Sequence, residues 1–455
     1  MDYTRTIAEF IANATYEDLP QKAIDITKTS IIDTLGCMVA ASSLAETSNV
    51  VYESYREVEG DGPCTIVGYG DRMPVYAAAF VNGAMGHGVD FDDCASIDKP
   101  AIHPTASVFP AAFTLAEHLG GVTGKDLILA VAIGNEVGIR IGDCPKGDML
   151  KDYCFFSQTI IGVFQATAAA CKLLKLDVDQ TVSALGLAIN RVSGPFHSLF
   201  TCDFRGIRDA FCNEEGIKCA LFAKGGLKGC VKALDVLFDE IYKGDVDMNG
   251  LTEGLGTVYK LADRIGYKPW PSCGSSYPFV QGILELMADN GLSGEDVAHV
   301  VLTGCQNGLD TFEPKAEKSA PTSSAVGKSA LPYIAALAVK NQDIALGDFT
   351  PEAFGDMEVR AYTDKIDYVL DNSYTSVEGK VDIETVDGRT FTTEAKALRG
   401  SSANPVSADE VYAKFKNNCK LARKPIAADA IDTMLDFLKG LEEQESTAPL
   451  TAILS

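Results

Sequence analysis

The sequence predicts a mainly α fold, with a large discontinuous all-helical domain and a smaller α+β domain. Helical apolar spacing runs through residues 1–265, strand-like runs with a hairpin signal follow within 266–404, and helical spacing returns in 405–455. The amphipathic C-terminal helices need a partner surface, which the N-terminal helical body offers. We therefore expect residues 1–265 and 405–455 to form the helical domain and residues 266–404 to form the α+β domain.

Successive amphipathic helices are expected along the first 265 residues, because apolar residues recur at helical spacing and the segments end in glycine or polar turns. Gly134, Gly138 and Gly142 lie four residues apart, so they share one helix face, where we expect close packing against another helix. The predicted segments are Ala23–Ala40, Val75–Gly88, Thr105–Leu119, Lys125–Gly142, Ser157–Leu174, Asp179–Asn190 and Gly216–Ala223.

The pattern changes after residue 266, where Pro269 and Pro271 interrupt the helical spacing. A helix is predicted at Phe279–Asn290, and an apolar run follows at Val297–Thr303. The Asp387-Gly388 pair between alternating residues predicts a β-hairpin. The strand-like segments are Met357–Tyr362, Gly379–Thr385 and Arg389–Ala395.

Helical spacing returns at Ser407–Asn417 and Ala427–Leu441, and Glu442–Ser455 is expected to be a loose tail.

Composition excludes several classes of protein. The chain has 455 residues, of which 46% are hydrophobic and 22% charged, as is usual for globular proteins. A net charge of −24 disfavours binding to nucleic acid or anionic membranes. The N-terminus lacks the features of a secretory signal, and the apolar stretch Leu127–Ile141 is too short and too polar to span a bilayer. We expect a soluble cytoplasmic protein.

Metal and redox sites are not expected. None of the 13 cysteines is spaced C-x2-C, and the 5 histidines form no H-x3-H pair. The cysteines are expected to be reduced and mostly buried.

The most informative stretch is residues 82–110, in which Asp90, Asp92 and Asp93 follow a predicted helix and His103 comes thirteen residues after Asp90. Because proline favours the first turn of a helix, His103-Pro104 predicts that His103 caps the next helix, an end that favours bound carboxylates. A carboxylate and an imidazole there can act as base and acid. Alternatively, these are solvated loop acids beside a capping histidine. His87 either orients Asp90 or, as we favour, is a structural residue at the helix end.

The pattern NG-x3-H-x2-DFDD at residues 82–93, followed by His103-Pro104, resembles the signature of the 2-methylcitrate dehydratase (MmgE/PrpD) family, which includes cis-aconitate decarboxylase and iminodisuccinate epimerase. Weaker matches at Asp33–Cys37, Gly124–Val137, Ala223–Gly229 and Lys268–Pro278 occur in the same order. The resemblance implies a helical domain, a smaller α+β lid with the site between them, a homodimer, and no required metal or organic cofactor.

The resemblance assigns catalytic roles to Asp90 and His103, although their spacing is about three residues longer than in the decarboxylase pattern. Three family positions differ. Phe156 and Tyr277 stand where the family has histidines, and Arg205 replaces a lysine, with Arg208 where a histidine commonly follows.

These replacements change the available chemistry. Phenylalanine cannot transfer a proton, arginine is a poor base but a good carboxylate ligand, and tyrosine can act as an acid or base when its pKa is lowered. Predicted catalytic residues are therefore Asp90, His103 and Tyr277. Predicted substrate-binding residues are Arg205, Lys99, Tyr153, Phe156, Gln158, Arg208 and Lys268.

Three functions follow. The first is a lyase, of the dehydratase or decarboxylase kind, that acts on a small di- or tricarboxylate by proton abstraction next to a carboxyl group. The second is an isomerase or epimerase, in which His103 and Tyr277 face each other across a cleft. The third is a non-catalytic relative that binds a metabolite or partner protein, which is favoured if Asp90 and His103 are far apart or if Phe156 plugs the site.

Overall fold

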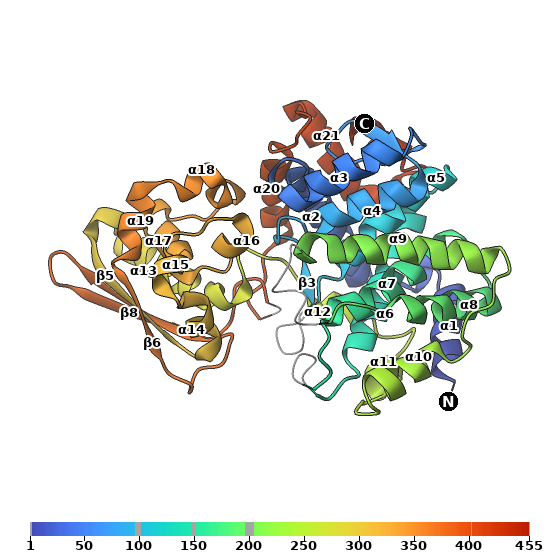
Figure 1. The fold of residues 1–455 in the computed structure, drawn as a ribbon, viewed down its shortest axis with the longest axis horizontal. Coiled ribbons are helices and arrows are strands. Elements are labelled where there is room, and N and C mark those ends of the chain that lie inside the picture. Colours follow the sequence, from blue (N-terminus) through green and yellow to red (C-terminus); the bar gives the residue numbers. More distant parts are fainter. Residues whose placement is uncertain (1, 96–101, 148–151, 196–203, 402, 455) are drawn as a thin grey trace. The chain divides into compact units, whose positions relative to one another are not determined.

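The computed structural model describes residues 2–95, 102–147, 152–195, 204–401 and 403–454 (Figure 1). The chain divides into two compact units, one made of Met1–Tyr267 with Ser407–Ser455 and the other of Lys268–Val406. Most of the described residues are helical and a small mixed sheet lies in the second unit, so the predicted fold class is confirmed. Within the described ranges, no helix combines the length and apolarity needed to cross a bilayer.

The first unit is a layered packing of helices around α2, α4, α6, α7 and α9. Helix α7 packs between α6 and α9, and α9 also packs against α4. The N-terminal helices are α1 (Tyr3–Asn13), α2 (Gln21–Leu44), α3 (Glu46–Val58), α4 (Val75–Gly86), α5 (Phe109–Leu119), α6 (Gly124–Gly142), α7 (Ser157–Leu173), α8 (Val178–Ala188) and α9 (Phe204–Lys224).

The predicted close packing of the glycine face on α6 is confirmed. A Cβ at Gly138 would lie 2.3 Å from the side-chain amide of Gln165 on α7, and one at Gly134 would lie 2.9 Å from the carbonyl oxygen of the same residue. Because neither position has room for a methyl group, glycine lets α6 and α7 approach at the level of the candidate site.

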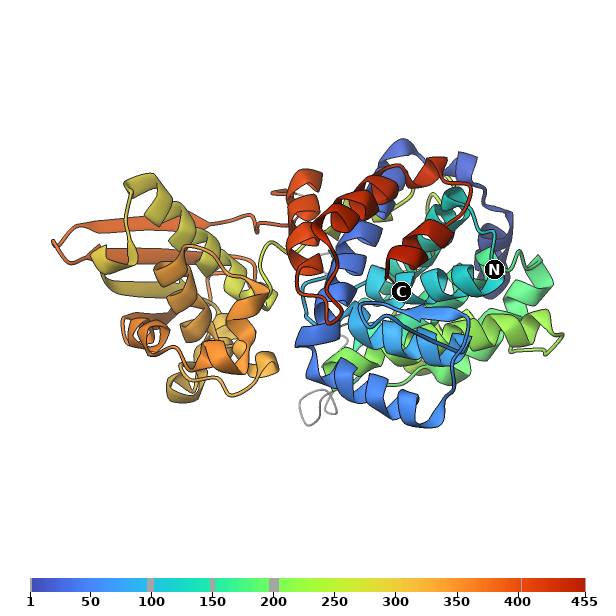
Figure 2. The same cartoon turned by 90° about the horizontal axis from the view of Figure 1, so that it is seen from above.

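The C-terminal segment rejoins the helical unit, where α20 (Ala408–Cys419) and α21 (Ala428–Lys439) pack against α2 (Figure 2). The expectation of a loose tail is wrong, because α22 (Ala448–Leu454) buries Leu450 and Leu454. Main-chain hydrogen bonds from Thr447 to Val122 and from Gly124 to Gln444 also hold this segment.

The second unit contains a four-stranded sheet in the order β6-β5-β7-β8, which pairs β5 with β6 in parallel and the other neighbours antiparallel. Its strands are β5 (Val297–Gly304), β6 (Ile366–Leu370), β7 (Gly379–Thr385) and β8 (Thr390–Ala395). The predicted hairpin is confirmed as β7 and β8. Helices α13 (Tyr277–Asn290) and α17 (Leu331–Asn341) share a buried core with the sheet.

The prediction of a strand at Met357–Tyr362 is wrong, because this segment forms α19 (Met357–Thr363). The side chain of Asp356 accepts hydrogen bonds from the main-chain N–H groups of Glu358 and Val359, which caps the helix. The strand lies just beyond, at β6.

Candidate active site

The acidic motif forms a tight turn directly after α4, which is capped at its C-terminal end by His87. The main-chain N–H of Asp90 donates to the carbonyl of His87 at 3.2 Å, and Asp90 adopts a left-handed φ of 52°. Aspartate tolerates this conformation better than most residues. The turn brings the side chains of Asp90 and Asp92 back onto the ring of His87.

Two imidazoles and one carboxylate form the centre of the site. Nδ1 of His87 lies 2.8 Å from Oδ1 of Asp92, and Nδ1 of His103 lies 3.2 Å from Oδ2 of the same carboxylate. The two rings are 4.1 Å apart between centroids. Nε2 of His87 lies 3.5 Å from Oδ1 of Asp90, and all four residues are buried. The structure therefore brings Asp90 and His103 together.

The expectation that His103 caps a long helix is wrong. A 3-10 turn, Thr105–Ser107, follows Pro104, and α5 begins only at Phe109. The His103 ring is instead directed to the acidic turn, where its Nδ1 lies 2.9 Å from the main-chain oxygen of Asp93.

This last contact fixes the hydrogen on the ring of His103. A carbonyl oxygen only accepts hydrogen bonds, so Nδ1 of His103 carries the hydrogen and donates it. The neutral ring then has its lone pair on Nε2. Among the residues that the structure describes, no hydrogen bond engages that Nε2 atom. His103 is therefore oriented as a base.

Burial and the neighbouring groups decide which side chains of the cluster carry a charge. Burial lowers the pKa of His87 to about 4, against the raising effect of Asp92, and nearby His103 and Arg208 lower it further. Burial also disfavours a charged Asp92, but the imidazoles of His87 and His103 lower its pKa below the ordinary value. We conclude that, near neutral pH, an ionised Asp92 lies between His103 and a neutral His87.

Asp93 is also buried, but its pKa is shifted in the opposite direction to that of Asp92. Burial raises its pKa to about 8, and the charges of Asp33 and Asp92 act in the same direction. The hydroxyl of Thr105 donates to Oδ2 of Asp93 at 2.6 Å, and the hydroxyl oxygen accepts from Asn135 on α6 at 2.9 Å. This network ties the acidic turn to the segment that carries His103.

Gln158, in the first turn of α7, holds the main chain of His103. Its Oε1 accepts from the N–H of His103 at 2.7 Å, and its Nε2 donates to the His103 carbonyl at 3.0 Å. The same amide nitrogen contacts the hydroxyl of Ser107 and lies 2.8 Å from Oδ1 of Asp209 on α9. Because every polar atom of Gln158 is engaged, its contacts in the structure are those of a positioning residue.

Arg208 is a buried cation on α9. Its Nε donates to Oδ2 of Asp209 at 3.2 Å, and its guanidinium lies over the ring of Phe156, 4.5 Å from the centroid. Within the described part of the chain, this is the one hydrogen bond of Arg208, which leaves both Nη groups for a ligand. Phe156 thus packs against the arginine.

The C-terminal segment also supports the site. Lys414 on α20 forms a buried ion pair with Asp33 on α2 at 2.7 Å. Its ammonium lies 3.7 Å from the ring centroid of Phe91 and also donates to the carbonyl of that residue. The residue between Asp90 and Asp92 is therefore anchored by a helix more than 300 positions away in the sequence.

The other predicted residues lie elsewhere or are not described. The hydroxyl of Tyr153 donates to the carbonyl of Asp245 at 3.1 Å, apart from the histidine cluster. Lys99 lies outside the described residues, and Arg205 lies at the start of α9. Tyr277 begins α13 in the smaller unit, where its hydroxyl donates to the carbonyls of Trp270 and Ser272 at 3.0 and 3.1 Å. Lys268 is buried in that unit too.

Sequence reasoning underestimated His87 and missed Asp92 and Asp209 as site residues. The spacing of three residues between His87 and Asp90 was a usable signal. For Asp209 there was none, because its partners Ser107 and Gln158 are distant in the sequence.

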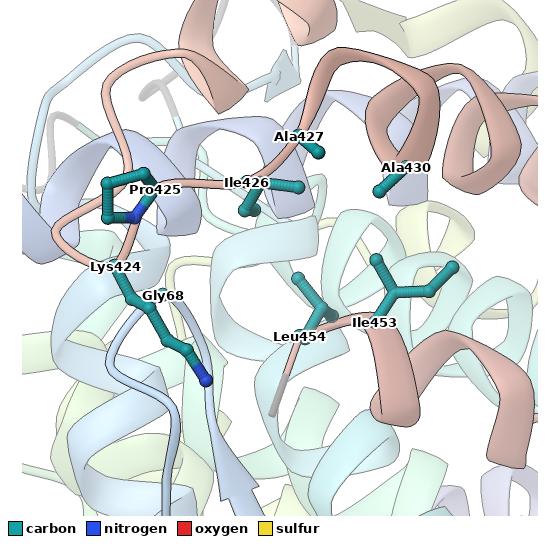
Figure 3. Close-up of a pocket in the computed structure, with 8 residues that line it drawn as sticks. All are labelled: Gly68, Lys424, Pro425, Ile426, Ala427, Ala430, Ile453 and Leu454. Carbon is teal, nitrogen blue, oxygen red and sulfur yellow. The ribbon is translucent and has the colours of Figure 1, made fainter.

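A separate cavity of about 130 Å³ lies beside the C-terminal helices of the first unit (Figure 3). It is lined by Gly68, Lys424, Pro425, Ile426, Ala427, Ala430, Ile453 and Leu454. Since this lining has no imidazole or carboxylate, we place the candidate chemistry at the histidine cluster.

Two models of one protein family match most of the chain. A model of the MmgE/PrpD N-terminal domain matches residues 5–238, and a model of the MmgE/PrpD C-terminal domain matches residues 270–436. The chain belongs to the MmgE/PrpD family.

Its relatives in the MmgE/PrpD family include enzymes from fungi and mammals. A cis-aconitate decarboxylase of Aspergillus terreus is 24% identical over 480 residues, covering 99% of this chain and 96% of that protein. The cis-aconitate decarboxylase of Homo sapiens is 27% identical over 473 residues, covering 99% and 94%. That of Mus musculus is 23% identical over 467 residues, covering 99% and 93%. The similarity thus extends over both units at low identity.

Proposed function

We propose that the protein is a lyase that acts on a small di- or tricarboxylate by proton transfer at the carbon next to a carboxyl group. The observation that carries this proposal is the orientation of His103, whose Nδ1 donates to a main-chain carbonyl and whose Nε2 keeps its lone pair. The names of the relatives, which are cis-aconitate decarboxylases, support the substrate class.

In this proposal His103 removes the proton from the substrate carbon, and Asp90 is the second group that can remove or deliver a proton. The lone pair on Nε2 accepts a proton from carbon, and the protonated ring is stabilised by Asp92 at 3.2 Å. Arg208 binds a substrate carboxylate through its Nη groups and stabilises the negative charge that develops on it. The desolvated surroundings strengthen each of these interactions.

The absence of histidine at residues 156 and 277 leaves two further outcomes open to experiment. An epimerase requires a second proton donor on the opposite face of the carbon, for which Tyr277 is the proposed group. A non-catalytic role is disfavoured, because Asp90 and His103 lie in one cluster with His87 and Phe156 contacts Arg208. We also propose a cytoplasmic homodimer that requires no organic cofactor.

Proton NMR of the purified full-length protein in deuterated buffer tests the proposal with cis-aconitate, 2-methylcitrate and aspartate-derived acids. We expect vinyl product signals with at least one acid, lost in His103→Gln and Asp90→Asn but retained in His118→Gln, whose side chain is exposed at the end of α5. Exchange at carbon without a new product would identify an epimerase. No exchange with any acid by a folded protein would refute proton-transfer chemistry on these substrates.

A further inference from the structure

We infer that Nε2 of His87, Nε2 of His103 and the carboxylate of Asp90 form a binding site for a divalent transition metal of the zinc class. The metal competes with proton transfer at the same atoms. Binding is independent of the proposed lyase activity, whereas the inhibition that we expect from it rests on that activity.

The spacing of the three groups suits a small cation. One ligand atom from each of His87, Asp90 and His103 lies within 4.8 Å of the others, and all three residues are buried. The 3.5 Å between Nε2 of His87 and Oδ1 of Asp90 is close to the edge of a zinc tetrahedron, which is about 3.4 Å for metal–ligand bonds of about 2.0–2.1 Å. The third ligand, from His103, has to move closer to the other two when the metal binds, because the three ligand atoms are within 4.8 Å rather than about 3.4 Å of one another.

The surroundings orient both rings for metal binding. Metal-binding histidines commonly donate the hydrogen of their second ring nitrogen to a carboxylate or a main-chain carbonyl, which fixes the ring and its tautomer. Here Asp92 accepts from Nδ1 of His87 at 2.8 Å, and the main-chain oxygen of Asp93 accepts from Nδ1 of His103 at 2.9 Å. Both Nε2 atoms therefore keep a lone pair, and Nε2 of His87 lies 3.5 Å from Oδ1 of Asp90.

The ligand set also selects the class of metal. Two imidazoles with one carboxylate suit zinc, iron, cobalt or nickel better than magnesium or calcium, which prefer oxygen ligands. The carboxylates of Asp90 and Asp92 together offset the charge of a dication, while the nearby Arg208 opposes it. Sequence motifs do not reveal the site, because His87 and His103 are sixteen residues apart and no H-x3-H pair exists.

Metal binding has a chemical consequence for the proposed reaction. A cation on Nε2 of His103 takes the lone pair that would accept the substrate proton. The metal-bound protein is then unable to use His103 as a base, and activity returns when the metal is removed.

Equilibrium dialysis of the metal-free, full-length protein with Zn²⁺, and absorption spectra with Co²⁺, test binding without any substrate. We expect one equivalent bound with affinity reduced at least ~10-fold in His103→Gln, His87→Gln and Asp90→Asn, and unchanged in His118→Gln. The Co²⁺ spectrum should lack a thiolate charge-transfer band, which separates this site from exposed Cys154 and Cys230.

Binding that is unaffected by all three ligand variants, or a thiolate band that accounts for the bound metal, would overturn the site. Circular dichroism of each variant excludes unfolding as the cause of lost binding. If the protein binds Zn²⁺ at these residues but converts no acid, the site stands and the proposed lyase fails. If saturating Zn²⁺ leaves turnover unchanged, the competition between metal and proton transfer is refuted.

Discussion

Replacing Asp92 by asparagine should switch the tautomer of His87 but not that of His103. The amide offers one accepting oxygen and one donating nitrogen where the carboxylate offers two acceptors. His103 keeps its hydrogen on Nδ1, because the main-chain oxygen of Asp93 still accepts it at 2.9 Å. Among the described residues, Asp92 is the only acceptor for Nδ1 of His87. In the variant the amide N–H therefore faces Nδ1 and the ring hydrogen moves to Nε2, toward Asp90 at 3.5 Å.

The size of the effect follows from the contact that is lost. A hydrogen bond to a charged group contributes about 1.5–3 kcal/mol, which corresponds to a bias of about 10- to 150-fold between the two tautomers of His87. In Asp92→Asn this bias disappears and the new contacts favour the other tautomer. Because burial holds the pKa of His87 at about 4, both forms are neutral near pH 7 and no change of charge confuses the observation.

Long-range nitrogen–proton NMR of protein labelled with ¹⁵N-histidine measures the tautomers directly, and with only 5 histidines the spectrum can be assigned by single substitutions. Asp367→Asn is the matched control, since Asp367 pairs with Nε2 of His299 at 2.8 Å in the smaller unit. It should move only the signals of His299. A His87 ring that keeps its hydrogen on Nδ1 in Asp92→Asn, or a switch of His103 instead, would refute the hydrogen-bond assignment.

Three further changes test how the site is supported. Lys414→Met should destabilise the helical unit by about 3–5 kcal/mol in urea denaturation, because it removes the cation of a buried ion pair. Lys416→Met, whose ion pair with Asp432 is exposed, should change the free energy of unfolding by less than about 1 kcal/mol. Gln158→Glu keeps the oxygen that accepts from the N–H of His103 but loses the N–H group that donates to the His103 carbonyl, so turnover should fall at least ~10-fold. Gln158→Asn has a side chain too short for both contacts, and its turnover should fall by as much. Equal turnover of Gln158→Glu and the wild type would contradict the positioning role. The pKa of Asp93 is raised from 3.8 to about 8, so between these values the native protein holds a proton that the unfolded chain has lost. The free energy of unfolding should therefore fall as the pH rises from about 4 to 8, by up to ~1.4 kcal/mol per pH unit. Asp93→Asn should flatten this slope in circular-dichroism melts, and an unchanged slope would contradict the assignment.

The fold class was accessible from the sequence because it depends on local patterns. Helical spacing and an Asp-Gly turn identify α6 and the β7–β8 hairpin without knowledge of the tertiary structure. The errors arose where a single polar contact or a tertiary contact outweighed local composition. Asp356 caps a helix in a segment with strand-like residues, and Leu450 gains a buried environment that only the folded N-terminal helices provide.

The candidate site was only partly accessible for the same reason. The sequence motif predicted that Asp90 and His103 act together, and the two residues lie in one cluster in the structure. Gln158 was predicted only as a substrate-binding residue. Its role in holding the main chain of His103 was not visible, because it contacts His103 from α7 across a gap of 55 positions and is itself held by Asp209 on α9. Such contacts require the packing of three helices, which spacing along the chain does not encode.

Two of the departures from the family pattern form a single contact in the structure. Phe156 and Arg208 both stand where the resemblance implies histidines, and the guanidinium lies 4.5 Å from the centre of the phenylalanine ring. The aromatic face of Phe156 stabilises the buried cation of Arg208, a stabilisation that two neutral imidazoles at these positions would not require. The pair therefore places a fixed positive charge where the resemblance implies two imidazoles, while His103, the proposed base, is retained. This arrangement favours the proposed chemistry, in which one histidine moves the proton and the cation holds the carboxylate. The loss of these two histidines therefore need not abolish a site built around His103.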